Sequence, residues 1–296
     1  MNKNCTMCPR HCGADRTAPG VSTGFCRMPW TFKIARAALH FWEEPCISGS
    51  KGSGTVFFSG CNLRCVYCQN GEISLQDKGE AVSSDKLVKI FDSLIEQGAH
   101  NINLVNPTHY AYQLSEVLRT YKSPVPIVYN SGGYESLETL KLLDGLVDIY
   151  LPDLKYCDSE KSMRYSGAKD YFEVASKAIL EMARQVGENV FAEDGTMKKG
   201  LIVRHLILPQ NTNASVRILE WLKEYLPAGN QVSVMSQYLP CSNASEFPEI
   251  NRRITAREYE KVLYRMNALG FEDGYVQERE SADACFIPSF DLTGIL

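Results

Sequence analysis

The chain has 296 residues, a formal net charge of −4 and 44% hydrophobic residues, which suffices for one large α/β domain with a modest appendage. No apolar stretch approaches the roughly 18 residues of a membrane span. The first residues also lack the long apolar region of a secretory signal. The net charge is negative, so the chain lacks the overall excess of basic residues that is typical of proteins that bind bulk nucleic acid. We therefore expect neither a membrane nor a nucleic acid as a partner.

The chain contains 11 cysteines, eight of them between residues 5 and 68. An odd total with this clustering is not the pattern of a secreted disulfide framework. We therefore expect a reducing, cytoplasmic location in which the thiols stay available for metal binding.

The first constellation is a C-x2-C-x3-C-x13-C pattern formed by Cys5, Cys8, Cys12 and Cys26. Four thiolates close either a structural zinc site or an auxiliary iron–sulfur cluster, and the spacing does not fix the metal. Scattered reduced cysteines are the alternative. We assign residues 1–50 to a Cys-rich N-terminal extension, held on the rest of the chain by a structural metal site. Residues 51–296 form the core domain with a C-terminal tail.

The second constellation is a C-x3-C-x2-C pattern formed by Cys61, Cys65 and Cys68. It directly follows the apolar run Thr55-Val56-Phe57-Phe58, which is typical of a buried strand. An ordinary electron-transfer 4Fe-4S cluster takes four thiolates, so three thiolates leave one iron open to an exchangeable ligand. Half of a zinc site is the alternative, although no companion pair of cysteines follows.

This pattern resembles the signature of the radical SAM superfamily, and the chain from about residue 50 onward is similar to pyruvate formate-lyase activating enzyme. The Cys-Pro-Arg-x-Cys-Gly head and the segment Gly274-Tyr275-Val276-Gln277 resemble an uncharacterised iron–sulfur branch of its homologues. The resemblance implies that the three thiolates hold a 4Fe-4S cluster at the catalytic centre. The amine and carboxylate of S-adenosylmethionine (SAM) would chelate the open iron, and Tyr67 would lie near the adenine.

Beyond residue 54, short apolar runs alternate with longer amphipathic ones, which predicts a parallel sheet with crossover helices. We expect strands at residues 55–59, 101–105, 126–130, 147–151, 201–208 and 231–235. We expect helices at residues 85–97, 111–121, 137–143, 171–186, 214–225 and 256–269. Residues 191–199, centred on Asp194-Gly195, predict a β-hairpin. The expected fold is therefore a partial (β/α)6, TIM-like radical SAM barrel.

Polar residues follow the second and third expected strands, where parallel α/β folds place their chemistry. The superfamily commonly has a Gly-Gly-Glu segment after the second strand to hold the methionyl amine. Asn106 and Thr108 offer polar groups for that purpose here, while His109 either takes part or begins the next helix. The glycine-rich turn with Asn130 and Ser131 resembles the ribose-contacting segment of activating enzymes.

Charged residues follow the fourth strand and interrupt the fifth. Asp153 and Lys155 point to the same side of their strand, either as an ordinary ion pair or, as the family's Asp-x-Lys implies, toward the methionyl group. Arg204 needs a partner in its apolar run and matches the SAM carboxylate or a substrate acid, whereas His205 points to the opposite face. Residues 236–238 are pocket candidates at the sixth strand.

The resemblance implies reductive cleavage of SAM to methionine and a 5'-deoxyadenosyl radical, followed by hydrogen abstraction. We expect an oxidoreductase that activates a glycyl-radical enzyme, whose loop enters a lateral gap of the six-stranded barrel. An electron donor such as flavodoxin or ferredoxin would supply the reducing equivalent. Modification of another protein, peptide or small molecule is one alternative. A non-catalytic iron–sulfur binding protein is another.

Overall fold

A single curved sheet organises the chain. The structure, a computed structural model, describes residues 3–17, 22–271, 274–277 and 287–295. In these residues the strand order is β10-β9-β8-β6-β5-β4-β2-β1-β3, with β7 paired to β8. Six neighbouring strands are parallel: β2 (Ser53–Phe58), β4 (Ile102–Val105), β5 (Ile127–Ser131), β6 (Ile149–Pro152), β8 (Met197–Leu206) and β9 (Gln231–Met235). They confirm the six predicted strands and the α/β fold.

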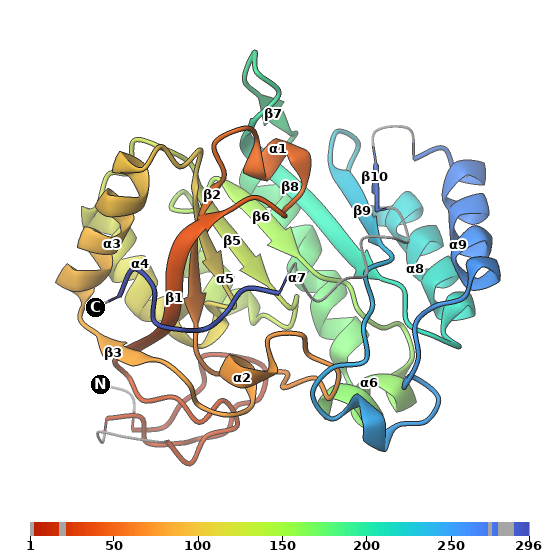
Figure 1. Cartoon of the computed structure of the whole chain (residues 1–296), viewed down its shortest axis with the longest axis horizontal. Helices are drawn as coiled ribbons and strands as arrows, with labels where there is room; N and C mark the ends of the chain where they lie inside the picture. The colour runs from red at the N-terminus through yellow and green to blue at the C-terminus, as the bar shows by residue number, and fades with distance from the viewer. Residues whose placement is uncertain (1–2, 18–21, 272–273, 278–286, 296) are drawn as a thin grey trace.

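Helices connect the parallel strands and cover the outer face of the sheet (Figure 1). The predicted six are α3 (Ser84–Glu96), α4 (Ala111–Thr120), α5 (Leu137–Leu143), α7 (Tyr171–Val186), α8 (Thr212–Tyr225) and α9 (Ala256–Ala268). The side chains of Ser83, Ser136 and Thr255 accept hydrogen bonds from backbone N–H groups in the first turns of α3, α5 and α9. These caps fix where the helices begin. Among the described residues, no helix is both long and apolar enough to cross a membrane.

Several short elements do not show in the sequence pattern. They are α1 (Pro45–Ser48), α2 (Gly71–Ser74), α6 (Ser159–Ser166) and the single-turn 3₁₀ helices η1 (Thr108–Tyr110) and η2 (Ala244–Glu246). Elements of one or two turns are too short to display a helical period. The predicted hairpin is confirmed, with β7 (Val190–Phe191) antiparallel to the start of β8.

Part of the segment assigned to the N-terminal extension belongs to the main sheet. β1 (Phe32–His40) runs antiparallel to β2, and β3 (Glu80–Val82) pairs with its other edge. The register of β1 shifts between Ile34 and Arg36, which breaks the alternation of inward and outward side chains. Its three alanines also have little preference for strands. Because of these two features, the sequence pattern did not predict β1.

The C-terminal tail lies along β1. β10 (Tyr275–Val276) extends the parallel sheet beside β9, and residues 287–295 return to the opposite edge. There the N–H of Ala37 donates to the carbonyl of Thr293 at 2.9 Å, and Phe290 packs edge-on against Phe57. The tail therefore covers part of the lateral gap that the sequence suggests is open.

The N-terminal segment of residues 3–17 and 22–31, here called the head, docks at the carboxyl ends of the parallel strands (Figure 1). Arg10 donates from Nε to the carbonyl of Asn62 at 2.8 Å and from Nη2 to that of Ser166 at 2.7 Å. Arg16 is 1% exposed and donates to the carbonyls of Met28, Pro29 and His109. Two arginines thus fasten the head to the core.

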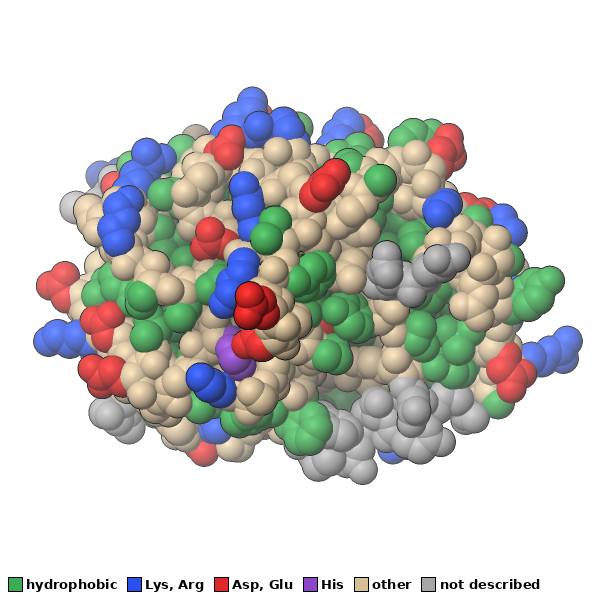
Figure 2. Space-filling view, turned by 90° about the horizontal axis from the view of Figure 1, so that it is seen from above, with side chains coloured by type: hydrophobic (Ala, Val, Ile, Leu, Met, Phe, Trp, Pro, Cys, Tyr) green, Lys and Arg blue, Asp and Glu red, His purple; other side chains and the backbone are tan. Residues whose placement is uncertain are grey.

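The opposite end of the barrel, at the amino ends of the strands, faces the viewer in Figure 2. Acidic and basic side chains are interspersed there among hydrophobic ones, in keeping with the formal net charge of −4.

We expect Arg16→Met to lower the free energy of unfolding by roughly 3 kcal/mol, because three buried carbonyls lose a charged donor. Equilibrium unfolding in urea measures this change, and limited proteolysis should show faster cleavage within the head. Arg257→Met, at an exposed position of α9, is the matched control. Wild-type stability of the Arg16 variant would contradict this account of docking.

Candidate active site

Side chains from the ends of all six parallel strands meet in one cavity at the carboxyl edge of the sheet. The cavity encloses about 1050 Å³ of empty space, part of it open to solvent. Its walls combine thiols, amides and charged groups, including Cys61, Cys65, Cys68, Asn106, Asn130, Ser131, Asp153, Lys155 and Arg204. Tyr67, Gln237 and Tyr238 also line it. Parallel topology explains the convergence, because all strand ends reach the same edge.

The loop after β2 presents the three thiols. Gly60 and Arg64 have positive φ of 81° and 51°, which turn the chain sharply out of β2. A side chain at Gly60 would collide with Met28 of the head, so glycine is required there. The N–H of Cys68 donates to the carbonyl of Cys65 at 3.1 Å and closes a tight turn. The thiols therefore gather on a short, well-supported loop.

Hydrogen-bond donors already face the sulfurs. The N–H of Leu63 lies 3.3 Å from Cys61 Sγ, and the hydroxyl of Ser166 lies 3.0 Å from Cys65 Sγ. Burial, reinforced by the neighbouring thiols, raises the pKa of Cys68 to about 12 and also raises the pKa of Cys61. Three ionised thiols here are costly unless a metal centre supplies positive charge.

A 4Fe-4S cluster fits this loop. The three cysteines are free thiols that share one cavity with donors toward their sulfurs. The described residues contain no group of three His, Cys, Asp or Glu side chains drawn together around a single metal ion. A cubane does not need such close grouping, because each thiolate binds a different iron.

Asp153 links two cations at the cavity wall. Its carboxylate accepts from Lys155 Nζ at 2.5 Å and from Arg204 Nε at 3.0 Å. Burial alone would raise the pKa of Asp153, but Lys155 and Arg204 outweigh it and the pKa is lowered. Burial likewise opposes the charge on Lys155, and Asp153 overcomes it to raise that pKa. All three groups are therefore ionised at neutral pH and can pair with a zwitterion.

Glu43 is a member of this network that the sequence did not reveal. It lies between β1 and α1, and its carboxylate accepts from Arg204 Nη1 at 3.1 Å and from the amide of Asn103 at 3.0 Å. Arg204 Nη2 in turn donates to Asn130 Oδ1 at 2.5 Å. The buried Arg204 therefore has two carboxylate partners, Glu43 and Asp153. In the sequence, an acidic residue in the loop after β1 does not by itself indicate a contact with Arg204.

Aromatic side chains build the wall behind Cys65. The hydroxyl of Tyr67 lies 2.7 Å from that of Tyr156, which lies 2.7 Å from Ser166 Oγ. Tyr67 also meets Tyr165 and Tyr238 edge to face. The chain of hydroxyls ends at the sulfur of Cys65, where a donor of this kind tunes the potential of a bound cluster.

Three polar residues near the strand ends do not line the cavity. The hydroxyl of Thr108 donates to the buried Glu135 at 2.6 Å, so it is not available to a ligand in the cavity. His109 Nε2 contacts the carbonyl of Ser59 at 2.7 Å, and burial lowers its pKa to about 3. His205 lies between the Leu154 carbonyl and Ser215, on the face opposite to Arg204 as expected.

The chain matches the radical SAM superfamily over residues 55–193, which include the three-thiol loop. An uncharacterised protein of Methanocaldococcus jannaschii is 31% identical over 271 residues, or 88% of this chain and 73% of the relative. The chain belongs to the radical SAM superfamily. Membership in this enzyme superfamily implies a 4Fe-4S cluster and SAM as cofactors.

Solved structures of other proteins share the fold. Streptococcus suis SuiB bound to its precursor peptide SuiA aligns with a TM-score of 0.53 and 12% identity, over 74% of this chain and 46% of that one. SuiB bound to S-adenosylmethionine aligns with a TM-score of 0.51 and 13% identity, over 73% of this chain and 47% of that one. This chain spans about half the length of SuiB.

We expect Lys155→Met to weaken SAM binding about tenfold or more, because a charge-assisted hydrogen bond contributes about 1.5 to 3 kcal/mol. Anaerobic calorimetry on cluster-loaded protein measures the dissociation constant. Lys177→Met, which removes an exposed cation paired with Glu173 on α7, is the control. Arg204→Met is a poorer probe, because it leaves the buried Glu43 without its cationic partner and Asp153 with Lys155 alone. An unchanged constant for Lys155→Met would remove this residue from the SAM site.

Proposed function

We propose that the chain cleaves SAM reductively at a 4Fe-4S cluster held by Cys61, Cys65 and Cys68. The resulting 5'-deoxyadenosyl radical would abstract a hydrogen atom from a glycyl-radical enzyme. The observation that carries the proposal is that three free thiols share one cavity with a zwitterion-binding set, Asp153 and Lys155. The resemblance to activating enzymes at these strand ends supports the class of substrate.

The residues of this chain would bind and shield the cofactors, which supply the radical chemistry when bound. Asp153 can accept from the methionyl ammonium, while Lys155 can pair with its carboxylate. Asn130 and Ser131 would contact the ribose, as the resemblance to activating enzymes implies. The buried tyrosines around Tyr67 would keep water away from the reacting carbon. Flavodoxin or ferredoxin would be the electron donor.

A second cavity continues the first toward β1 and would receive the substrate. It encloses about 680 Å³ of empty space, part of it open to solvent. It shares Asn130, Arg204 and Gln237 with the SAM cavity and adds Trp42 and Glu43. Ile287 and Pro288 of the tail lie on its rim, so the side of the barrel is partly covered. This cover favours a second candidate function, modification of a peptide or small molecule that fits under the tail.

We expect Cys61→Ala, Cys65→Ala and Cys68→Ala together to abolish 5'-deoxyadenosine formation, because no thiolate is left to hold the cluster. The assay is anaerobic incubation with SAM and dithionite followed by chromatography. Cys157→Ala should retain activity, since Cys157 lies outside the cavity and contacts the carbonyl of Ala214. Residual product from the triple variant would refute the assignment, and a wild-type chain without product would favour the non-catalytic alternative.

The substrate class is tested by anaerobic mixing with glycyl-radical enzymes encoded in the same genome. A glycyl doublet in the electron paramagnetic resonance (EPR) spectrum, dependent on SAM, is the expected result. Turnover of a small metabolite or peptide without a protein radical would instead establish the second candidate. Lys155→Met serves as the control, because it should weaken the doublet without changing the protein partner.

A further inference from the structure

The head folds its cysteines into one compact loop. The N–H of Cys5 donates to the carbonyl of Ala14 and the N–H of Gly13 donates to that of Cys5, each at 3.1 Å. His11 and Gly13 have positive φ of 41° and 66°, which reverse the chain beside Cys12. The first three cysteines of the head therefore lie on a closed turn of ten residues, from Cys5 to Ala14.

Cys26 is brought to the same turn by its own segment. A side chain on Gly24 would lie 3.2 Å from Cys12 Sγ, so the chain two residues before Cys26 packs directly on that sulfur. Arg16 holds the segment from the other side through the carbonyls of Met28 and Pro29. Residues 12 and 26 are thus neighbours in space although 13 residues separate them in the sequence.

The thiols of the head lie in a buried environment with one open edge. Cys5, Cys8 and Cys26 are buried, whereas Cys12 is exposed. Four thiols gathered in one docked segment, three of them buried, form a ligand set that a metal centre can occupy.

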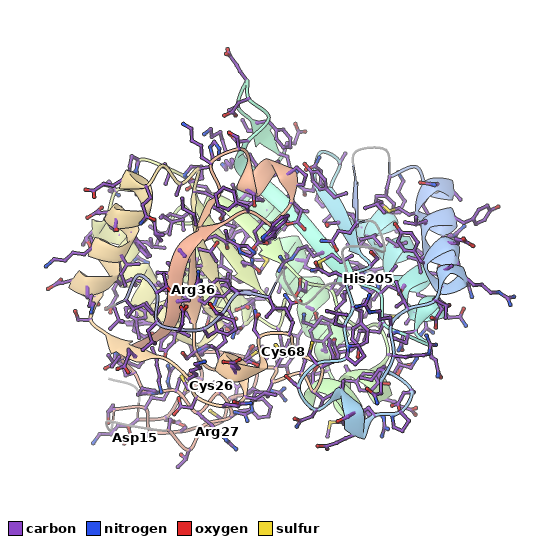
Figure 3. All side chains as sticks on the ribbon, viewed as in Figure 1. Asp15, Cys26, Arg27, Arg36, Cys68 and His205 are labelled. Atoms are coloured by element: carbon purple, nitrogen blue, oxygen red, sulfur yellow. The ribbon has the colours of Figure 1, made fainter. Side chains whose placement is uncertain are left out.

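The head lies directly against the loop of the catalytic cluster. Arg10 bonds the carbonyls of Asn62, within that loop, and of Ser166, whose hydroxyl faces Cys65 Sγ. Arg64, in the same loop, is close enough to Cys61 and to Cys26 for its guanidinium to interact with the charge of either sulfur. Cys26 of the head and Cys68 of the catalytic loop lie at the same end of the barrel (Figure 3).

We propose that Cys5, Cys8, Cys12 and Cys26 bind a second, redox-active 4Fe-4S cluster. Four thiolates complete such a cluster without an open iron, so this site would carry electrons and not SAM. Like the loop at Cys61, the head does not gather three ligands around a single ion, as tetrahedral zinc would require. The arginines Arg10, Arg16 and Arg64 offset the added negative charge of a reduced cluster. The exposed edge at Cys12 faces solvent, where a low-potential one-electron donor can approach.

The test uses the full chain carrying Cys61→Ala, Cys65→Ala and Cys68→Ala, so that its result does not depend on the proposed function. After anaerobic reconstitution with iron and sulfide, we expect about four irons per chain. Reduction with dithionite should then give an EPR signal of one unpaired electron. One zinc per chain without iron, or no metal at all, would overturn the proposal.

Matched variants assign the ligands. Adding Cys12→Ala and Cys26→Ala to the triple variant should remove the iron, whereas adding Cys46→Ala, at a buried cysteine outside the head, should retain it. Circular dichroism confirms that each protein is folded. Full iron content after loss of Cys12 and Cys26 would overturn the ligand assignment.

The wild-type chain tests the position of the site. With both clusters reduced, the neighbouring unpaired electrons should broaden the EPR spectrum beyond the sum of two single-cluster spectra. Those reference spectra come from the triple variant above and from Cys12→Ala with Cys26→Ala in the otherwise wild-type chain. A spectrum equal to their sum would contradict the placement of the two clusters side by side.

Discussion

One buried guanidinium joins the parts of this structure. Arg204 projects from β8 into the barrel and contacts Asp153 beyond β6, Asn130 on β5 and Glu43 before α1. A cation at this depth is tolerated only with anionic partners. The same charge therefore closes the wall of the cavity that holds the three thiols, and it holds the connection between β1 and β2 inside the barrel. The shape of the cavity and the position of the β1–β2 connection thus both depend on the need of the buried Arg204 for anionic partners.

The arrangement leaves Lys155 as the group that can exchange partners. Arg204 already has two carboxylates, while Lys155 is paired with Asp153 alone among the ion pairs of the described residues. An incoming zwitterion can replace that single contact at both ends without leaving a buried ion uncompensated. The network thus separates a cation fixed by two carboxylates, Arg204, from one held by a single carboxylate, Lys155.

Both ends of the chain complete the core domain. The head fastens to the catalytic loop through Arg10 and to η1 through Arg16, while the tail hydrogen-bonds to β1. The head lies at the carboxyl ends of the strands and the tail lies along the side of the barrel. The barrel is consequently more enclosed than six strands alone would leave it, and the second cavity, at Trp42 and Glu43, adjoins the first beneath the tail residues Ile287 and Pro288.

The parallel strands, their helices and the residues at the strand ends could be predicted from the sequence, because hydrophobic periodicity and short ligand spacing are local properties. It also placed Arg204 and His205 on opposite faces, since side chains alternate along a strand. The hydrogen-bond and ion-pair partners of these side chains became known only from the folded chain. Glu43 meets Arg204 across 161 positions, Ser166 meets Cys65 across 101, and Arg10 meets Asn62 across 52. Thr108 turns to Glu135 for the same reason, because which polar group a side chain meets depends on how distant segments pack, and no local period encodes that.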